Sequence, residues 1–333
     1  MVDKLNKKWN FLLTGPIHHK AQKLLESQAN FIKSPVGSTS AEISELIREQ
    51  QSDALIVRGG KINKEIMTAS PCLKVIVKHG VGYNNIDIDA ATELGLPVLF
   101  TPHANYESVA EHTLALLFSI TKRINLFDRD MKSNKSWPKS KYSPEELKHK
   151  CIGLIGIGRI GLRVIQLITP LEMQVLVYDP FVSSNALPSD VKKVKTIKEL
   201  VQNADILSIH CPLTKETACI LGKEELNSMK PNAYLINTAR GGIVDETALI
   251  EVLENGLIAG AALDTFSQEP LSANNPLLKL DNVIVTPHVA GTTEQSFIRM
   301  GVTAVKLAFQ ILEGKEEDIP LDNFINREVL EKK

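Results

Sequence analysis

Short apolar runs alternate with amphipathic stretches along almost the whole chain, the pattern expected where strands alternate with helices. In the first hundred residues the runs FLLTG, ALIVRG, KVIVKHG and PVLFT are predicted strands, and AEISELIREQ is a predicted helix. The runs are continuously apolar, which is typical of parallel sheets covered by helices on both faces. The first part of the chain is therefore predicted to form an α/β unit.

The alternation is interrupted once and then resumes. Residues 104–133 predict one long helix, and a loop with Trp137, Pro138 and Pro144 follows it. Six further predicted strands come next, CIGLIGIG, MQVLVYD, DILSIHC, AYLINTA, GAALDTF and VIVTPH, each separated from the next by a helical stretch. This series predicts a second parallel α/β unit. A last helical stretch, TTEQSFIRMGVTAVKLAFQILEG, is long enough to pack back on the first unit.

Length and composition agree with two globular domains. The chain has 333 residues, of which 43% are hydrophobic and 23% charged, with a formal net charge of -1. At about 150 residues per domain, two domains can each bury a core. The near-neutral charge argues against a nucleic-acid partner, and no apolar run reaches the length of a membrane span. The 4 cysteines have no metal-ligand spacing, so no metal site is predicted.

The same features predict where the protein resides. Cysteines without a paired spacing are expected to be reduced thiols in the cytoplasm. The N-terminal stretch MVDKLNKKWNFLLTG has too short an apolar run for a secretory signal peptide. A cytoplasmic location is therefore expected.

A glycine-rich turn in the second unit predicts a dinucleotide site. GLIGIGRIG places Gly156, Gly158 and Gly161 between a predicted strand and a predicted helix. In such a motif the first glycine allows a tight turn, the second lets the backbone approach the pyrophosphate, and the third lets helix and strand pack closely. Asp179 ends the next predicted strand, where a carboxylate can accept hydrogen bonds from the adenosine ribose.

Asp179 also bears on the choice of cofactor. A carboxylate repels the 2′-phosphate of NADP, and no Lys or Arg follows Asp179 until Lys192. NAD is therefore predicted as the cofactor. The alternative, that Asp179 only caps the turn after its strand, stays open.

Three later predicted strands each lead to a polar residue of a different kind. Arg240 follows AYLINTA, Glu269 follows GAALDTF, and His288 follows VIVTP. Because the carboxyl ends of parallel strands share one edge of a sheet, these residues can converge beside a bound nicotinamide. A histidine can move a proton, a carboxylate can fix its tautomer, and a guanidinium can bind a substrate carboxylate through two hydrogen bonds. The set predicts hydride transfer on a 2-hydroxy acid.

Each of these residues also has an ordinary structural interpretation. Arg240 could be an ion-pair residue at a strand end, Glu269 a turn residue, and His288 a loop histidine. Gly241 and Gly242 could leave room for a ligand or could make a sharp turn into the next helix. The combination of all three polar residues behind a dinucleotide motif favours the catalytic interpretation.

A series of motifs gives the chain a family resemblance. KVIVKHGVGYNNID, LIGIGRIG, HCPLT, NTARGGIVDETAL, AALDTFSQEP, TPHVAG and DNFIN occur in that order. They resemble the D-isomer-specific 2-hydroxyacid dehydrogenase family, nearest its phosphoglycerate dehydrogenase branch, which serves serine biosynthesis. The resemblance implies an α/β fold of two doubly wound parallel-sheet domains. It further implies a Rossmann NAD-binding domain at 104–290, a flavodoxin-like substrate-binding lid at 1–103 and 291–333, and a homodimer formed through the NAD-binding domain.

The resemblance also implies roles for individual residues. Arg240, Glu269 and His288 would be the catalytic set, with Arg240 also binding the substrate. Besides the three motif glycines, the implied cofactor contacts are Arg159, Ile160, Asp179, His210, Pro212, Thr217, Thr238, Asp264 and Gly291. Glycine-rich strand ends in the first unit could cradle a carboxylate with backbone N–H groups. The substrate contacts predicted there are Arg58, Gly59, His79, Gly80, Val81 and Gly82.

The predicted function is NAD-dependent interconversion of a small 2-hydroxy acid and its 2-oxo acid, with D stereochemistry implied by the resemblance. Arg58, Lys78 and His79 are candidate cations for a phosphate, which favours D-3-phosphoglycerate as the substrate. Lys78 and His79 stand where many phosphoglycerate enzymes have Arg-Ala, and His103 stands where glycine is common. Reduction of hydroxypyruvate, glyoxylate or another 2-oxo acid is therefore an alternative. An NAD-sensing corepressor-like scaffold is an alternative from another class.

Overall fold

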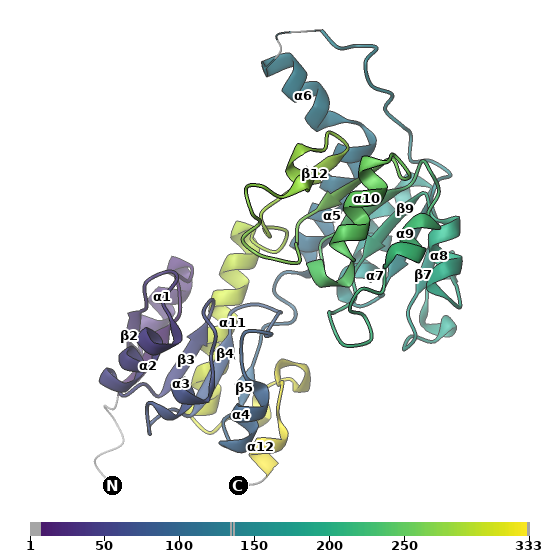
Figure 1. The fold of residues 1–333 in the computed structure, drawn as a ribbon. Coiled ribbons are helices and arrows are strands. Elements are labelled where there is room, and N and C mark those ends of the chain that lie inside the picture. The colour runs from purple at the N-terminus through teal and green to yellow at the C-terminus, as the bar shows by residue number, and fades with distance from the viewer. Residues whose placement is uncertain (1–7, 134, 136, 332–333) are drawn as a thin grey trace, which may run out of the picture. The chain divides into compact units, whose positions relative to one another are not determined.

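The chain forms two compact units (Figure 1). The structure is a computed structural model that describes residues 8–133, 135 and 137–331. Unit 1 combines the residues up to Asn105 with the residues from Thr292 onward, and unit 2 runs from Tyr106 to Gly291. The extreme N-terminal stretch, on which the expectation about a signal peptide partly depends, lies outside the described residues.

Unit 1 is built on a five-stranded parallel sheet with the order β2-β1-β3-β4-β5. Its strands are β1 (Trp9–Leu13), β2 (Ala29–Lys33), β3 (Ala54–Val57), β4 (Val75–Lys78) and β5 (Val98–Leu99). Its α-helices are α1 (His19–Glu26), α2 (Ser40–Glu49), α3 (Lys64–Thr68), α4 (Ile88–Glu93), α11 (Glu294–Leu312) and α12 (Glu328–Glu331). This strand order is that of a flavodoxin-like sheet.

Helices cover both faces of this sheet, which explains its continuously apolar strands. Phe11 and Leu13 of β1 pack in one cluster with residues of α1 and α11. Leu12, between them, packs in another cluster with residues of α2, α3 and α4. Successive strand residues point to opposite faces, so both must be apolar when both faces are covered. Each fully buried Leu or Phe side chain contributes roughly 1.5–3 kcal/mol.

A buried asparagine joins the C-terminal segment to the sheet of unit 1. Asn326 is 1% exposed, and its Oδ1 accepts the backbone N–H of Val98 at 2.7 Å. Its Nδ2 donates to the Leu96 carbonyl and to the Thr92 hydroxyl, both at 3.0 Å. Nearby, Leu99 and Phe324 form an antiparallel bridge. The predicted packing of the tail on the first unit is therefore found, and it depends on specific polar contacts as well as on α11.

Unit 2 is built on a seven-stranded parallel sheet with the order β12-β11-β10-β9-β6-β7-β8. Its strands are β6 (Cys151–Ile155), β7 (Gln174–Tyr178), β8 (Val191–Lys193), β9 (Ile206–Ile209), β10 (Tyr234–Asn237), β11 (Gly260–Leu263) and β12 (Val283–Val285). Its α-helices are α5 (Tyr106–Thr121), α6 (Ile124–Ser133), α7 (Arg159–Ile168), α8 (Ile197–Asn203), α9 (Lys223–Asn227) and α10 (Glu246–Glu254). The chain order reverses between β6 and β9, the point at which doubly wound sheets bind ligands.

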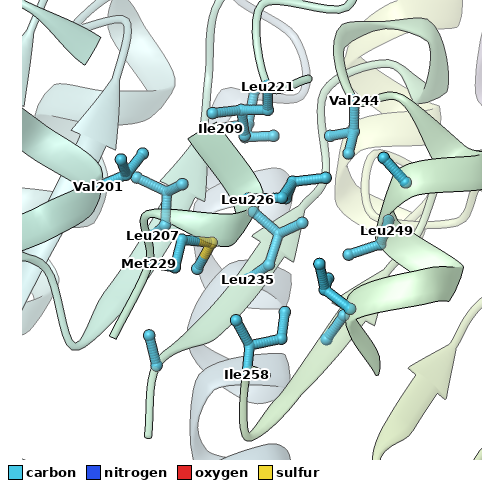
Figure 2. Packing of buried hydrophobic residues seen from close by; sticks show 14 of the residues in the cluster. Val201, Leu207, Ile209, Leu221, Leu226, Met229, Leu235, Val244, Leu249 and Ile258 are labelled. Atoms are coloured by element: carbon cyan, nitrogen blue, oxygen red, sulfur yellow. The ribbon is translucent and has the colours of Figure 1, made fainter. Parts of the chain in front are cut away.

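Two apolar clusters cover the faces of this second sheet. On one face, Leu207 of β9 and Leu235 of β10 pack with Leu226 of α9 and Leu249 of α10 (Figure 2). On the other face, residues of α5 and α7 cover alternate positions of the same strands. The two parallel sheets confirm the predicted α/β class and its doubly wound domains.

The prediction of one long helix over residues 104–133 was wrong. The segment forms α5 and α6, separated at Arg123, whose φ of 55° is left-handed. The Arg123 guanidinium donates to the Tyr234 hydroxyl at 3.1 Å and lies 5.3 Å from the centre of its ring. This tertiary contact ends α5, and the sequence has no glycine or proline there to indicate a break. No helix among the described residues is both long and apolar enough to cross a bilayer.

The sequence pattern did not predict two of the strands, β2 and β8. Each lies at an edge of its sheet. The two end residues of β8 are only partly buried and its central residue is exposed, and β2 has one buried residue among five. Edge strands carry polar residues and short apolar runs, so the continuous apolar pattern that marked the other strands is missing.

Candidate active site

The three motif glycines have different steric roles. Gly156 has a φ of 86°, and a Cβ there would lie 2.8 Å from the Cys211 nitrogen. A Cβ at Gly161 would lie 2.7 Å from the carbonyl oxygen of Gly156. Gly158 has no atom within 4 Å of its Cβ position. Two glycines are thus required by packing within the protein, whereas Gly158 leaves open space for a ligand.

Gly158 is also the N-cap of α7, and it supplies no side-chain hydrogen bond to the helix. Arg159 and Ile160 form the first turn. Backbone N–H groups at such an uncapped N-terminus can bind phosphate oxygens, helped by the helix dipole. The turn therefore fits a dinucleotide pyrophosphate.

Asp179 directly follows β7 and lies against the glycine-rich turn. One carboxylate oxygen accepts the Ile157 N–H at 3.0 Å, and the other accepts the Phe181 N–H at 2.9 Å. The residue therefore does cap its own turn, as one interpretation of the sequence held. A carboxylate has about four lone-pair sites, so two remain to accept ribose hydroxyls. The two interpretations of Asp179 are compatible.

His210 lies at the switch point, directly after β9. Its Nε2 is 2.9 Å from the Ser208 hydroxyl. Its Nδ1 is buried and has no hydrogen-bond partner among the described residues. Burial lowers the pKa of His210 to about 4, so the ring is neutral near pH 7. A buried polar atom without a partner is costly, and a bound cofactor can supply the missing partner.

The other predicted cofactor residues lie on the loops that follow the strands of unit 2. Thr217 donates its hydroxyl to the Pro212 carbonyl at 2.6 Å, which closes the loop after β9. Thr238, just beyond β10, shares a 3.0 Å hydrogen bond with Thr113 of α5. Gly291 is the last residue of the unit.

Arg240 is positioned by a turn that the preceding asparagine builds. Asn237 ends β10; its Nδ2 donates to the Arg240 carbonyl at 2.9 Å, and its Oδ1 accepts the Ala239 N–H at 3.0 Å. The Arg240 Nη1 donates to the Ala239 carbonyl at 2.6 Å. Burial lowers the pKa of Arg240, and the negative charge of Glu269 opposes that shift. A guanidinium has five N–H donors, so Arg240 retains donors for an anion.

The glycine after Arg240 is required by the protein itself. A Cβ at Gly241 would overlap the backbone carbonyl of Phe266, and a Cβ at Gly242 would lie 3.3 Å from a Leu213 methyl group. A single turn of 3₁₀ helix then covers Gly241–Ile243. The space at Gly241 is therefore filled by the loop after β11, not by a ligand, and the sharp turn is the correct alternative.

Glu269 and His288 form a hydrogen-bonded pair. The Glu269 Oε2 lies 2.7 Å from the His288 Nδ1, and its Oε1 accepts the Phe266 N–H at 3.0 Å. The carboxylate therefore holds the proton on Nδ1 and leaves Nε2 for chemistry. The His288 side chain is 45% exposed and that of Glu269 37%, so a ligand can reach the pair. His288 itself has a φ of 53°, an uncommon value for a residue with a side chain.

Asp264 holds the loop that carries His288. Its side chain is fully buried, and its oxygens accept the N–H groups of Val289 at 2.9 Å and Ala290 at 2.8 Å. The Thr286 hydroxyl also donates to it, and His112 of α5 lies 3.7 Å away. Asn237 and Thr286 were not predicted as site residues. Each is a polar residue at the end of an apolar strand, and this is the same signal that identified Arg240.

In unit 1, Arg58 directly follows β3. Its backbone N–H donates to the Thr14 hydroxyl at 3.0 Å, and its Nη1 donates to the Pro16 carbonyl at 2.9 Å. The N–H of Gly59 is engaged by Thr14 as well. The backbone N–H groups of Arg58 and Gly59 are therefore not available to an anion, whereas the Arg58 side chain is.

The structure corrects the expectation that Lys78 and His79 add positive charge for a phosphate. Lys78 is 8% exposed, and its Nζ donates to the Asn85 amide oxygen at 2.8 Å and to the Arg58 carbonyl at 3.2 Å. Burial lowers the pKa of His79 to about 4, with further lowering by the charges of Arg58 and Lys78. His79 is therefore neutral near pH 7, and Lys78 is committed to the protein.

The glycine-rich strand end after β4 is only partly available as a cradle. The Gly80 N–H donates to the Thr101 hydroxyl at 3.0 Å. The N–H groups of Val81 and Gly82 make no hydrogen bond to the described residues. His103, where glycine was expected, pairs with Asp322 at 2.6 Å. Of the predicted backbone donors, Val81 and Gly82 are the two that remain.

Known proteins resemble this chain in sequence and in structure. The family model described as D-isomer specific 2-hydroxyacid dehydrogenase, NAD binding domain, matches residues 114–290. The chain is 38% identical over 317 residues to D-3-phosphoglycerate dehydrogenase of Archaeoglobus fulgidus, covering 95% of this chain but only 59% of that relative. It is 40% identical over 294 residues to glyoxylate reductase of Thermofilum pendens, covering 86% and 85% of the two chains.

A solved structure agrees with these relatives. The crystal structure of D-lactate dehydrogenase from Aquifex aeolicus, complexed with NAD and lactic acid, is similar with a TM-score of 0.83 and 30% identity. The similarity covers 95% of this chain and 99% of that chain. It therefore includes both units.

The close approach at Gly241 can be tested by a pair of alanine substitutions. Gly241→Ala should destabilise unit 2 by roughly 1–3 kcal/mol or more, because the new Cβ must displace the Phe266 backbone. Gly242→Ala is the matched control, since its Cβ meets only a side-chain methyl group. Urea unfolding monitored by circular dichroism measures both. Equal midpoints for the two variants would contradict the steric argument.

Proposed function

Since the chain belongs to the D-isomer-specific 2-hydroxyacid dehydrogenase family, as its motif series predicted, we propose that it is an NAD-dependent oxidoreductase interconverting a 2-hydroxy acid and its 2-oxo acid. The Glu269–His288 pair is the observation that carries this proposal, with its accessible histidine and its carboxylate at 2.7 Å. The negative charge of the same carboxylate interacts favourably with the Arg240 guanidinium. An acid/base and an anion-binding group are therefore gathered in a unit that matches an NAD-binding domain.

The side chains divide the work of the reaction. In the oxidative direction the Nε2 of His288 accepts the proton of the substrate hydroxyl, and the Glu269 carboxylate stabilises the resulting imidazolium. Arg240 binds the substrate carboxylate and so orients C2. NAD⁺, when bound, would supply the acceptor for the hydride of C2. In the reductive direction His288 returns the proton to the carbonyl oxygen.

The cofactor would be held by groups that the structure leaves open. The N-terminus of α7 at Gly158 suits the pyrophosphate, and Asp179 suits the adenosine ribose. The orphaned Nδ1 of His210 is a further polar contact for the bound cofactor. We take NAD as the cofactor because a second negative charge beside Asp179 would be repelled.

For the substrate we propose an acid of the kinds named by the relatives, with D-3-phosphoglycerate first and hydroxypyruvate or glyoxylate as alternatives. The exposure of Arg58 favours a phosphorylated substrate. Arg58, Lys78 and His79 were the predicted cations, and of these only the Arg58 guanidinium is neither buried nor neutral. A panel of 2-oxo acids with NADH distinguishes these substrates.

Replacement of His288 tests the reaction and also the alternative of a corepressor-like scaffold. His288→Ala should lower kcat by roughly 10²–10⁴, whereas NADH binding measured by fluorescence should persist. His149→Ala is the matched control, because His149 is an exposed histidine of unit 2 with a φ of 66°. A wild type with no more turnover of any 2-oxo acid than His288→Ala would support the scaffold instead.

Replacement of Asp179 tests the choice of cofactor. Asp179→Asn keeps one of the two oxygens that accept the Ile157 and Phe181 N–H groups but removes the charge, so the ratio of kcat/KM for NADH over NADPH should fall about tenfold or more. Asp190→Asn, at an exposed position of the same unit, should leave the ratio unchanged. A wild type that already uses the two cofactors equally well would refute the role of Asp179.

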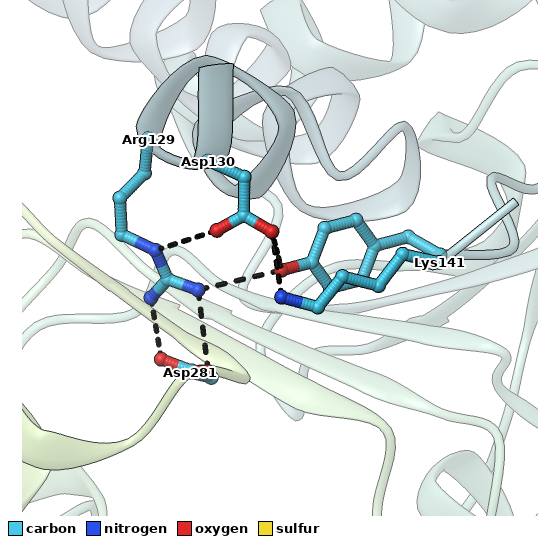
Figure 3. A network of polar contacts seen from close by, with 5 residues as sticks. Arg129, Asp130, Lys141 and Asp281 are labelled. Carbon is cyan, nitrogen blue, oxygen red and sulfur yellow. Dashed lines mark hydrogen bonds and ion pairs between the residues drawn. The ribbon is translucent and has the colours of Figure 1, made fainter. Parts of the chain in front are cut away.

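We also propose that two copies associate through unit 2. Ile124 and Met131 of α6, and Trp137 beyond it, are 52%, 44% and 78% exposed. A polar network fixes α6 against the rest of the unit (Figure 3). Arg129 pairs with Asp281, and Asp130 pairs with Lys141. Large apolar side chains exposed on a fixed helix are typical of a protein interface.

Light scattering can measure this association. Wild-type protein should have the mass of two chains, and the double variant Met131→Glu with Trp137→Glu should have the mass of one, because charges are costly to bury at an interface. Phe181→Glu is the control, since Phe181 is 95% exposed elsewhere in unit 2. A double variant that retains the wild-type mass would place the interface elsewhere.

A further inference from the structure

The Glu269 loop, residues 266–275, follows β11 in unit 2 and is held by little apolar packing. Phe266 is buried at its start, and Leu271 packs against the same apolar cluster. The four residues between them, 267–270, are all exposed. Burial therefore does not fix the part of the loop to which Glu269 belongs.

One hydrogen bond from outside the loop reaches this exposed part. The backbone N–H of Ser267 donates to the Oε2 of Glu246 at 2.9 Å. Among the residues that the structure describes, no other backbone N–H or C=O of residues 267–270 is hydrogen-bonded. A hydrogen bond to an ionised carboxylate is stronger than one between neutral groups. Glu246 therefore supplies the polar restraint on this backbone.

Glu246 also binds the other end of the loop. Its Oε1 accepts a hydrogen bond from the Nδ2 of Asn275 at 2.9 Å. The Oδ1 of Asn275 accepts the Leu277 N–H at 2.9 Å, which defines the orientation of the amide. The two hydrogen bonds of this one carboxylate, the Glu246 bridge, thus join Ser267 to Asn275.

The helix α10 gives the Glu246 bridge a fixed base. Glu246 is the first residue of α10, and the side chain of Asp245 caps that helix. Leu249 and Val252, farther along α10, are buried in the apolar cluster that covers the sheet. A carboxylate in the first turn of a helix is also favoured by the helix dipole. Because Glu246 is fixed relative to the sheet, its partner Ser267 is fixed as well.

The position of Ser267 determines where the Glu269 carboxylate points. The N–H of Phe266, directly before Ser267, donates to the Oε1 of Glu269 at 3.0 Å. The Oε2 of Glu269 then lies 2.7 Å from the Nδ1 of His288. On one side the Phe266–Ser267 backbone lies so close to Gly241 that no Cβ fits between them. A displacement of this backbone must therefore be away from Gly241, and it would move Glu269 relative to His288.

A cavity beside the Glu246 bridge leaves the loop room for such a displacement. Its volume is about 490 Å³, and its lining includes Glu246, Ser267, Gln268 and Asn275. Atoms that line an open space lack packing partners on that side. Packing therefore cannot replace the hydrogen bond from Ser267 to Glu246.

We propose that Glu246 is a positioning residue for the reaction and that it acts through Glu269. The Glu246 bridge holds Ser267 and hence Phe266, whose N–H directs the Glu269 carboxylate toward the Nδ1 of His288. Glu246 does this without contacting the reacting atoms. The inference rests on the proposed function, since it takes Glu269 and His288 as the acid/base pair.

Steady-state kinetics of Glu246→Ala test this role, with NADH and whichever of glyoxylate, hydroxypyruvate and 3-phosphohydroxypyruvate the wild type reduces fastest. The kcat should fall about 10- to 100-fold, because a misplaced catalytic group costs that much. The KM for the acid and the Kd for NADH should change less than about threefold, since Glu246 binds neither. Glu254→Ala, at an exposed position of the same helix, is the matched control and should keep the wild-type kcat. A wild-type kcat in Glu246→Ala would overturn the proposal.

A second background separates positioning of Glu269 from a general structural role. In Glu269→Gln the carboxylate that Glu246 positions is already lost. Adding Glu246→Ala should therefore lower kcat by less than about twofold further, because residues that act through one another are not additive. The same full loss of kcat in both backgrounds would contradict the proposal, since Glu246 would then act on something other than Glu269.

An exchange of polarity tests the Glu246 bridge even if Glu246→Ala fails to fold. Glu246→Gln alone places two amide donors against each other, and Asn275→Asp alone places two carboxylates against each other, so each should lower kcat. The double variant restores both hydrogen bonds, because the new amide at 246 donates to the new carboxylate at 275 and still accepts the Ser267 N–H. Its kcat should return to within about threefold of the wild-type value.

The outcomes distinguish this inference from the proposed function. A double variant no more active than the weaker single variant would refute the Glu246 bridge while leaving the reaction intact. A wild type that reduces none of the three acids would instead refute the proposed function.

Discussion

The arrangement of the proposed active site depends on how one fully buried carboxylate is satisfied. An ionised group away from water is costly unless it receives hydrogen bonds, and Asp264 receives them from the loop after β12. Two successive backbone N–H groups and the hydroxyl of Thr286 point at the same side chain. The residue between these donors, His288, is thereby held at a backbone angle that it would seldom adopt unaided. Its partner Glu269 then needs only to extend from the neighbouring loop.

In unit 1, two of the three residues predicted as cations are buried and the third is exposed. Lys78 and His79 are drawn inward, where one is bound by Asn85 and the other is neutral. Arg58 stays at the surface, stacked on an aromatic ring. Desolvating a positive charge costs more than leaving it in water, so a cation that remains exposed and oriented is available to a ligand. Of the three cations of this unit that were predicted to meet a phosphate, Arg58 is therefore the one that is available to a ligand.

The sequence predicted those parts of the protein that local rules determine. Continuous apolar runs identified the buried strands, because both faces of each sheet are covered, and the spacing of three glycines identified the turn before α7. Arg240, Glu269 and His288 were predicted as site residues because each follows a strand that ends at the same edge of one sheet. The break at Arg123 could not be predicted, since it depends on Tyr234, a residue more than a hundred positions away. The burial of Lys78 and the close approach of the Phe266 backbone to Gly241 likewise arise from tertiary packing alone.

The covering of one sheet face by α11 has a consequence for the order in which the chain can fold during synthesis. Ala304, Val305 and Ala308 of this helix pack in the same cluster as Phe11 and Leu13, yet almost three hundred residues separate them along the chain. Unit 2 is continuous and can be completed while α11 is still being translated. The part of that face of the first sheet that α11 covers, beside α1, must meanwhile remain exposed, which is the condition in which nascent chains engage chaperones and aggregate. Protection of that face is therefore a requirement of biosynthesis, separate from anything that the finished site demands.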